Sequence, residues 1–185
     1  MQRTSRLLPL FLFLLAFAVP AWAQQAAPTV VIVVRHAERD QGNDPGLTAA
    51  GSARAQALAA DLKDAGVAAI YSTQFRRTVD TGKPLADALG QQVNVLPIDP
   101  AQAAAYPAAL AADILAKHRG HTVVVVGHSN TVPQIVKALS GVTVPEISDT
   151  EYDHMFIVMI PAQGQARVVR AMYGVPQTGG AHMHP

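Results

Sequence analysis

The chain has 185 residues, of which 50% are hydrophobic, with 14 basic and 13 acidic side chains and no cysteine. A formal net charge of +1 gives no sign of a nucleic-acid-binding surface, and the lack of cysteine excludes disulfides, a catalytic thiol and a thiolate metal site. The chain is long enough for one domain to bury a core without such cross-links.

The first 23 residues have the features of a secretory signal peptide. Two arginines precede an apolar stretch over residues 7–19, which is shorter than the ~20 residues that a membrane span needs. Ala21 and Ala23 are small residues at the positions that a signal peptidase reads. We expect cleavage after Ala23, a periplasmic or secreted protein and no stable membrane insertion afterwards. Without the two leader arginines the net charge is 12 − 13 = −1.

An uncleaved anchor is the alternative, and the sequence disfavours it because no cysteine could carry a lipid and no second hydrophobic span follows. The predicted organisation is therefore a signal peptide over residues 1–23, a linker over 24–28, one domain over 29–173 and a flexible, Gly- and Pro-rich tail over 174–185.

Residues 29–35 (TVVIVVR) predict a strand buried on both faces, and it ends in the sequence Arg-His-Ala-Glu of residues 35–38. Functional side chains of open α/β sheets gather where such strands end. An arginine there needs an anionic partner, and a histidine can attack phosphorus when one ring nitrogen is held and the other is free. A polar loop whose ions pair with one another is the alternative.

A polar loop over residues 40–46 leads to a helix that Thr48 caps and that runs to about Ala65. A short strand over residues 67–71 follows, and a second helix starts within residues 72–78 and continues to Leu89. This second helix carries two adjacent arginines near its start. Neighbours on a helix point about 100° apart, so both cannot face one ligand equally.

The second half of the chain repeats the alternation of strands and helices. A short strand over 93–96 precedes Asp99 and an alanine-rich region, and a helix covers about 107–118. A buried run over 122–126 (TVVVV) ends in Gly-His-Ser-Asn of residues 127–130 and leads to a helix over 133–139. Two last strands, over 155–160 and 166–172, are predicted to pair in antiparallel orientation.

This order predicts an α/β three-layer sandwich, with a mostly parallel sheet, helices on both faces and one antiparallel edge strand. The ends of the first, second and fourth strands then lie at one edge of the sheet. Arg35, His36, His128 and one arginine of the second helix are expected to share a pocket there.

Four segments, in this order, resemble the histidine phosphatase superfamily, which includes phosphoglycerate mutases and the smaller phosphohistidine phosphatases. They are residues 35–38 (RHAE), 47–51 (LTAAG), 71–78 (YSTQFRRT) and 127–129 (GHS), within a resemblance that runs from about Val30 to Tyr173. The resemblance implies a phosphoglycerate mutase-like fold and a phosphorylated histidine, with no cofactor and no required metal ion. It also selects Arg76, not Arg77, as the arginine that faces the pocket.

Two guanidinium groups and two imidazoles around one point would hold a tetrahedral anion, and phosphoryl transfer needs chiefly positioning and neutralised charge. We expect His36 to attack phosphorus and water to hydrolyse the resulting phosphohistidine. Arg35, Arg76 and His128 are expected to hold the phosphoryl oxygens. Asn130 could bind phosphate or cap the helix, and Glu38 is expected to orient Arg35 or His36.

The general acid is left open by the sequence. The mutase-like branch has a glutamate downstream of the second-helix arginine, and this chain offers only Asp99 at that place, which could equally be a turn carboxylate. Glu151 or Asp153 could serve instead, or the site could lack an acid, as the small phosphohistidine phosphatases do. An acid-free site would favour substrates with good leaving groups.

The expected function is an exported, metal-independent phosphatase that hydrolyses a phosphomonoester or phosphoramidate. Its partner would be a small phosphorylated substrate or a phosphoprotein, with no nucleic acid. The alternatives are a phosphate-ligand binding protein with little or no activity, a phosphoglycerate mutase-like phosphotransferase, and a metal-binding protein that uses His121, His128 and the tail.

Overall fold

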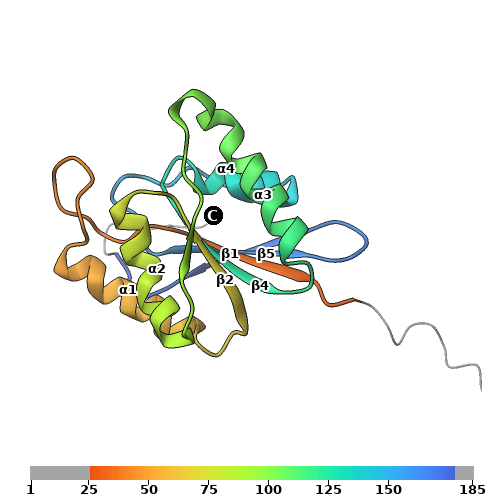
Figure 1. The fold of residues 1–185 in the computed structure, drawn as a ribbon, viewed down its shortest axis with the longest axis horizontal. Helices are drawn as coiled ribbons and strands as arrows, with labels where there is room; N and C mark the ends of the chain where they lie inside the picture. Colours follow the sequence, from red (N-terminus) through yellow and green to blue (C-terminus); the bar gives the residue numbers. More distant parts are fainter. Residues whose placement is uncertain (1–25, 178–185) are drawn as a thin grey trace, which may run out of the picture.

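A computed structural model of the chain describes residues 26–177 (Figure 1). The predicted signal peptide and the predicted tail from residue 178 onward lie outside these residues. The elements, in chain order, are β1 (Thr29–Arg35), α1 (Ala49–Leu62), β2 (Val67–Ser72), α2 (Arg76–Leu89), β3 (Val93–Val95), a 3₁₀ helix (Pro100–Ala105), α3 (Tyr106–Lys117), β4 (Thr122–Gly127), α4 (Val132–Ser140), β5 (His154–Ile160) and β6 (Arg167–Met172).

The strands form one six-stranded sheet in the order β3-β2-β4-β1-β5-β6. β1, β2, β3 and β4 are parallel, whereas β5 pairs with β1 and β6 pairs with β5 in antiparallel orientation. The predicted α/β fold, with a mostly parallel sheet and antiparallel pairing at one edge, is confirmed. β1 and β4 lie side by side in the centre because both are continuous runs of apolar, β-branched residues that can be buried on two faces.

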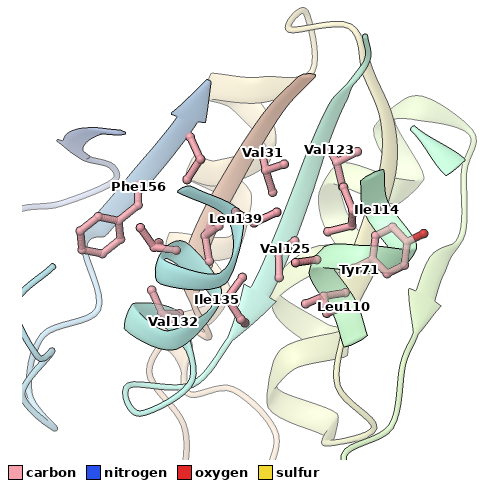
Figure 2. Close-up of a cluster of buried hydrophobic side chains, with 14 of the residues drawn as sticks. Val31, Tyr71, Leu110, Ile114, Val123, Val125, Val132, Ile135, Leu139 and Phe156 are labelled. Atoms are coloured by element: carbon pink, nitrogen blue, oxygen red, sulfur yellow. The ribbon is translucent and has the colours of Figure 1, made fainter. Parts of the chain in front are cut away.

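Two helices cover each face of the sheet (Figure 1). α3 and α4 pack on one face through Leu110, Ile114 and Ile135, which meet Val31 and Val125 from the sheet (Figure 2). α1 and α2 pack on the other face through a second buried cluster that contains Leu58, Leu62 and Leu85.

Local signals in the sequence fix where the helices begin and end. The Thr48 hydroxyl accepts the N–H of Gly51 at 3.0 Å and so caps α1. Gly90 and Gly141 end α2 and α4 with φ of 64° and 74°, a backbone conformation that favours glycine. The sequence did not predict the 3₁₀ helix over Pro100–Ala105, which lies in the alanine-rich region after Asp99.

The described part of the predicted tail is hydrogen-bonded to the domain. Gln177 donates its backbone N–H to Asp153 Oδ2 at 3.1 Å and its side-chain amide to Glu38 Oε1 at 3.3 Å, and its Oε1 accepts the N–H of Tyr152 at 2.7 Å. Residues 174–177 therefore run back along the loop before β5. Between residues 26 and 177, no helix is both long and apolar enough to cross a membrane.

Candidate functional site

The two histidines of the predicted pocket lie side by side at the carboxyl edge of the sheet. β1 and β4 are neighbours in register, with Arg35 opposite Gly127, and the His36 N–H donates to the Gly127 carbonyl at 2.8 Å. The His36 and His128 rings consequently approach each other to 5.4 Å between centroids, edge to face. The two imidazoles can thus reach one small anion.

His36 is held through one ring nitrogen only. Its Nδ1 lies 2.8 Å from the Ala37 carbonyl oxygen, which can only accept, so Nδ1 carries the proton and Nε2 carries a lone pair. Burial lowers the pKa of His36 to about 4, and the charges of Arg35, Arg77 and Arg39 add to this effect. The ring is therefore neutral near pH 7 and has the free nitrogen that a nucleophile requires.

His128 is buried in the same cationic surroundings. Its backbone N–H donates to the Thr131 hydroxyl at 2.9 Å, which fixes the turn between β4 and α4. Burial is the main cause that lowers the pKa of the His128 imidazole, and together with the charges of Arg77, His36, Arg35 and Arg39 it brings this pKa to about 3. An anion in the pocket would offset these charges.

Arg35 lies beneath the loop that precedes β5. Its NH1 donates to the carbonyls of Ser148 and Glu151 at 2.6 and 2.9 Å, and its guanidinium carbon lies 4.0 Å from the centroid of the Tyr152 ring. Asp149, whose side chain is 97% exposed, approaches NH2 only to 3.9 Å. The loop therefore fixes the Arg35 guanidinium in place and leaves its charge largely uncompensated.

The structure corrects the predicted orientation of the two adjacent arginines. Arg76 points to solvent, with a side chain 68% exposed and its Nε 3.3 Å from Asp80. Arg77 is only 18% exposed, and its NH2 lies 3.5 Å from His128 Nδ1. Arg77 is therefore the second guanidinium of the pocket, in the place that the family pattern assigned to Arg76.

Helical spacing explains this outcome and could have predicted it. Arg76 lies four residues before Asp80 and seven before Lys83, on the charged outer face of α2. Arg77 lies four residues before Thr81, which is fully buried against the Arg-His-Ala-Glu turn. The resemblance counted residues from Ser72, whereas the buried threonines of the helix give the correct face.

Three buried threonines complete the site, and the sequence analysis did not identify them. The Thr81 hydroxyl accepts the N–H of Ala37 at 2.9 Å and donates to the Arg77 carbonyl at 2.7 Å, so it joins the His36 turn to α2. Thr73 Oγ1 lies 3.1 Å from His128 Nε2 and 2.8 Å from Thr78 Oγ1. Isolated threonines carry no sequence signal for such contacts, because the partners come from separate strands.

Aromatic rings flank the histidine pair on two sides. The Phe75 ring lies 5.3 Å from His128 and beneath the Arg77 guanidinium, at 4.5 Å. The Tyr152 ring lies 5.9 Å from His36. These rings shield the charged groups from water on those sides and strengthen their electrostatic interactions.

Glu38 does not contact Arg35 or His36, so the structure contradicts its predicted orienting role. Both oxygens of its carboxylate accept from Arg54 Nε at 3.0 Å, and Oε1 also accepts from NH2 at 2.9 Å. Arg54 in turn donates to the carbonyls of Tyr173 and Val175 at 2.9 and 3.0 Å. Glu38 thus joins the end of β1 to α1 and to the C-terminal segment.

The other predicted site residues lie farther from the histidines or have other partners. Asn130 is exposed, and the side chain that fixes the turn is that of Thr131. Asp99 is exposed, and its carboxylate accepts the N–H of Ala101 at 2.9 Å, which is the turn role that the sequence left open. Glu151 accepts the N–H of Ser148 at 2.9 Å.

Asp153 is also directed away from the pocket. It is buried, accepts the N–H of Gln177 and lies 3.9 Å from His154 Nδ1. Among the described residues, two carboxylates approach the pocket arginines, that of Asp149 near Arg35 and that of Asp44, in the loop after β1, near Arg77. Asp44 Oδ1 lies 3.7 Å from Arg77 NH1 and accepts the N–H of Arg76 at 2.9 Å, at the start of α2.

A cavity of about 1360 Å³ elsewhere on the domain does not contain the histidine pair. It lies between α1, β6 and the C-terminal segment, and its lining includes Glu38, Ser148 and Glu151. We assign the site to the histidines and arginines, because these groups carry the chemistry. Over residues 26–177, no three histidine, aspartate or glutamate side chains cluster as they would around a metal ion.

The site and the fold together define an α/β protein with two histidines and two arginines at the carboxyl edge of its sheet. The model of the histidine phosphatase superfamily (branch 1) matches residues 31–98. The matched segment includes Arg35 and His36 at the end of β1 and Arg77 at the start of α2. This match agrees with the resemblance to the histidine phosphatase superfamily that the four sequence segments carry.

Solved structures of phosphatases share the fold over most of their length. A mycobacterial glucosyl-3-phosphoglycerate phosphatase has a TM-score of 0.59 at 16% identity, covering 76% of this chain and 97% of that one. The protein histidine phosphatase SixA, complexed with tungstate, has a TM-score of 0.57 at 23% identity, covering 77% and 96%. A phosphoserine phosphatase from Entamoeba histolytica has a TM-score of 0.57 at 17% identity, covering 80% and 98%. No curated protein matches the chain by sequence.

Proposed function

We propose that the protein is an exported phosphatase that hydrolyses a phosphomonoester or phosphoramidate through a phosphohistidine on His36. The observation that carries this proposal is a pair of buried hydrogen-bond donors that have no acceptor. The Nε–H groups of Arg35 and Arg77 are buried and have no hydrogen-bond partner within residues 26–177, and they lie next to two neutral histidines. Buried donors without a partner are costly, and a tetrahedral oxyanion between the arginines would satisfy both.

The first chemical step uses the free Nε2 of His36. Its lone pair attacks phosphorus, a P–N bond forms, and the bond from phosphorus to the leaving group breaks. Arg35 and Arg77 neutralise the phosphoryl oxygens, which is the main requirement of this chemistry. Water then attacks phosphorus and releases His36 and inorganic phosphate.

A site without a carboxylic acid fits the geometry best. Within residues 26–177, no carboxylate forms a hydrogen bond or ion pair with either pocket imidazole, and Asp99 caps a turn. A leaving group that departs without protonation is then required. This favours phosphoramidates and aryl phosphates over alkyl esters. The phosphatase activities in the names of the structural neighbours agree with a phosphatase of this kind, and SixA is named as a protein histidine phosphatase.

Turnover of p-nitrophenyl phosphate by the chain that starts at Gln24 tests the proposal. We expect activity that survives EDTA, disappears in His36→Ala and gives an acid-labile phosphate on His36 when the reaction is quenched. A phosphate-binding protein would bind phosphate without turnover. A metal-dependent enzyme would lose activity with EDTA, and a mutase would transfer the phosphoryl group to a second substrate in preference to water.

Export is tested separately, by expressing the full chain in a Gram-negative host. We expect a periplasmic product whose N-terminus is Gln24, because the leader has a charged start, a short apolar stretch and an Ala-x-Ala site. Recovery of the protein with Met1 intact in the membrane fraction would contradict this part of the proposal.

A further inference from the structure

The two ring nitrogens of His128 face two different fixed neighbours. Nδ1 lies 3.5 Å from Arg77 NH2, and Nε2 lies 3.1 Å from Thr73 Oγ1. An arginine nitrogen can only donate a hydrogen bond. Nδ1 therefore carries a lone pair, and in a neutral ring the proton is on Nε2.

The hydroxyl groups behind His128 lead independently to the same assignment. Thr78 Oγ1 lies 2.7 Å from the Phe75 carbonyl oxygen, which can only accept, so Thr78 donates there. Thr73 lies 2.8 Å from Thr78 Oγ1 and must donate to it, because Thr78 has no second proton. Thr73 Oγ1 is left as an acceptor for His128 Nε2–H.

This chain of hydrogen bonds is shielded from solvent. Thr73 and Thr78 are fully buried, and His128 is 8% exposed. Water cannot replace either hydroxyl, so the opposite tautomer would leave two lone pairs facing each other across 3.1 Å. The Thr73 and Thr78 hydroxyls therefore disfavour the tautomer of His128 that carries its proton on Nδ1.

We propose that Thr73 is a positioning residue that holds His128 with its proton on Nε2, so that the Nδ1 lone pair can accept a proton from the water that hydrolyses the phosphohistidine. This inference rests on the proposed phosphatase function. In the step, the water oxygen bonds to phosphorus while the bond from phosphorus to His36 Nε2 breaks and its electron pair returns to Nε2. When the phosphoryl group is bound, Arg77 NH2 donates to its oxygens in place of the long 3.5 Å contact with Nδ1, so the Nδ1 lone pair is free. One proton of the water then moves to His128 Nδ1 and passes from there to the released phosphate.

The position of His128 fits this role. Its ring centroid lies 5.4 Å from that of His36, so one phosphoryl group and its attacking water can lie next to both rings. Burial and, to a smaller extent, the neighbouring positive charges lower the pKa of His128. The negative phosphoryl group offsets the charges, so the ring becomes more basic when the phosphohistidine has formed. A carboxylate is then not needed for the hydrolysis step.

Thr73→Val removes the hydroxyl at nearly constant shape and tests the assignment. Nitrogen-15 NMR of the histidine rings reports the tautomer directly. We expect wild-type His128 to show a protonated Nε2 and an unprotonated Nδ1, and Thr73→Val to show a mixture of tautomers. We also expect kcat to fall about 10- to 100-fold with KM within about threefold, and breakdown of the quench-trapped phosphohistidine to slow more than its formation.

Two matched variants separate positioning from general damage. Thr73→Ser keeps the hydroxyl and should restore the wild-type tautomer and a kcat within about threefold. Ser72→Ala is the control, because Ser72 is adjacent and equally buried but donates to the Thr73 carbonyl at 3.0 Å, away from His128. It should leave the tautomer unchanged. If Thr73→Val fails to fold, Thr78→Val interrupts the same series of hydrogen bonds one bond farther from the His128 ring. It should give the same mixture of tautomers.

A protonated Nε2 in folded Thr73→Val or Thr78→Val, with wild-type kcat, would overturn the inference. The inference would also be overturned if wild-type His128 carried its proton on Nδ1. The NMR result does not depend on turnover, so it decides the tautomer even if no phosphate compound is hydrolysed. Absence of turnover in the wild type would instead count against the proposed function.

Discussion

At the scale of single residues, the site depends on which groups are held and which are left without a partner. Arg35 is fixed by two carbonyls and an aromatic ring, and His36 is fixed by one carbonyl. In each case the atom without a partner, Arg35 Nε or His36 Nε2, is the one that the proposed chemistry uses. Groups that are held in place before the phosphoryl group binds can stabilise the charge that develops during its transfer.

The first prediction concerns the two adjacent arginines at the start of α2. Arg77→Ala should lower kcat/KM for p-nitrophenyl phosphate about 100-fold or more, because it removes a buried charge-assisted donor from the phosphoryl oxygens. Arg76→Ala should stay within about threefold, because its partner is Asp80 and its side chain is exposed. Steady-state kinetics at fixed ionic strength measures both. The reverse order of effects would restore Arg76 as the pocket arginine.

Some of these residues were predictable from the sequence and others were not. His36 and His128 could be placed together because each follows a buried parallel strand, and adjacent strands end at the same edge. Thr73 and Tyr152 could not be found in this way, because their roles depend on contacts with residues from other segments. Glu38 was assigned to the nearest charged neighbours in sequence, whereas its partner Arg54 lies on α1.

At the scale of elements, the structure shows how α1 and the C-terminal segment support the end of β1. Arg54 on α1 binds the Glu38 carboxylate and two carbonyls of the C-terminal segment. Its side chain is 5% exposed and that of Glu38 is 18% exposed. Breaking a buried pair leaves an uncompensated charge in a poorly hydrated site, and this is more costly than the loss of a surface pair.

The second prediction concerns this pair. Arg54→Ala should lower the free energy of unfolding by about 3 kcal/mol, because it leaves Glu38 and two carbonyls without a donor. Lys83→Ala, which removes an exposed ion pair with Asp87 one turn along α2, should cost less than about 1 kcal/mol. Urea unfolding followed by circular dichroism gives both values. Equal effects would mean that the Arg54 network contributes no more than a surface pair.

The elements themselves were largely readable from the sequence. Runs such as TVVIVVR and TVVVV are typical of central strands because they are continuous, apolar and β-branched, and Gly90 and Gly141 mark the ends of helices. The 3₁₀ helix at Pro100 was not predicted, since an alanine-rich segment with a proline at its start does not distinguish one helical turn type from another.

At the scale of the whole molecule, the fold places a cationic, partly dehydrated pocket at one edge of the sheet. Two imidazoles are buried there without an acidic partner among the described residues, and both have lowered pKa values. Groups whose pKa differs between the folded and unfolded states make stability depend on pH. The geometry of the site therefore has a consequence that can be measured without any substrate.

Acidification should destabilise the protein above the range in which its carboxylates titrate. The unfolded chain binds a proton on each of these histidines near pH 6.5, whereas the folded chain does so only near pH 4 for His36 and pH 3 for His128. Between these pH values the unfolded state binds more protons than the folded state. The free energy of unfolding is therefore highest above about pH 6.5 and decreases as the pH falls below this value. Each histidine should cost about 2 kcal/mol between pH 7 and pH 5.

Urea unfolding of wild type, His36→Asn and His128→Asn at pH 7, 6 and 5 measures this effect. Each substitution should reduce the loss of stability on acidification, because the asparagine does not titrate, whereas His121→Gln, at an exposed turn position, should leave the loss unchanged. Saturating phosphate should also reduce the loss in the wild type, because the anion offsets the arginine charges and the folded state then accepts protons at higher pH. If the free energy of unfolding of the wild type stays constant from pH 7 to pH 5, the two imidazoles do not lie in a dehydrated cationic pocket. The buried Nε–H groups of Arg35 and Arg77 would then no longer be evidence for an oxyanion-binding site.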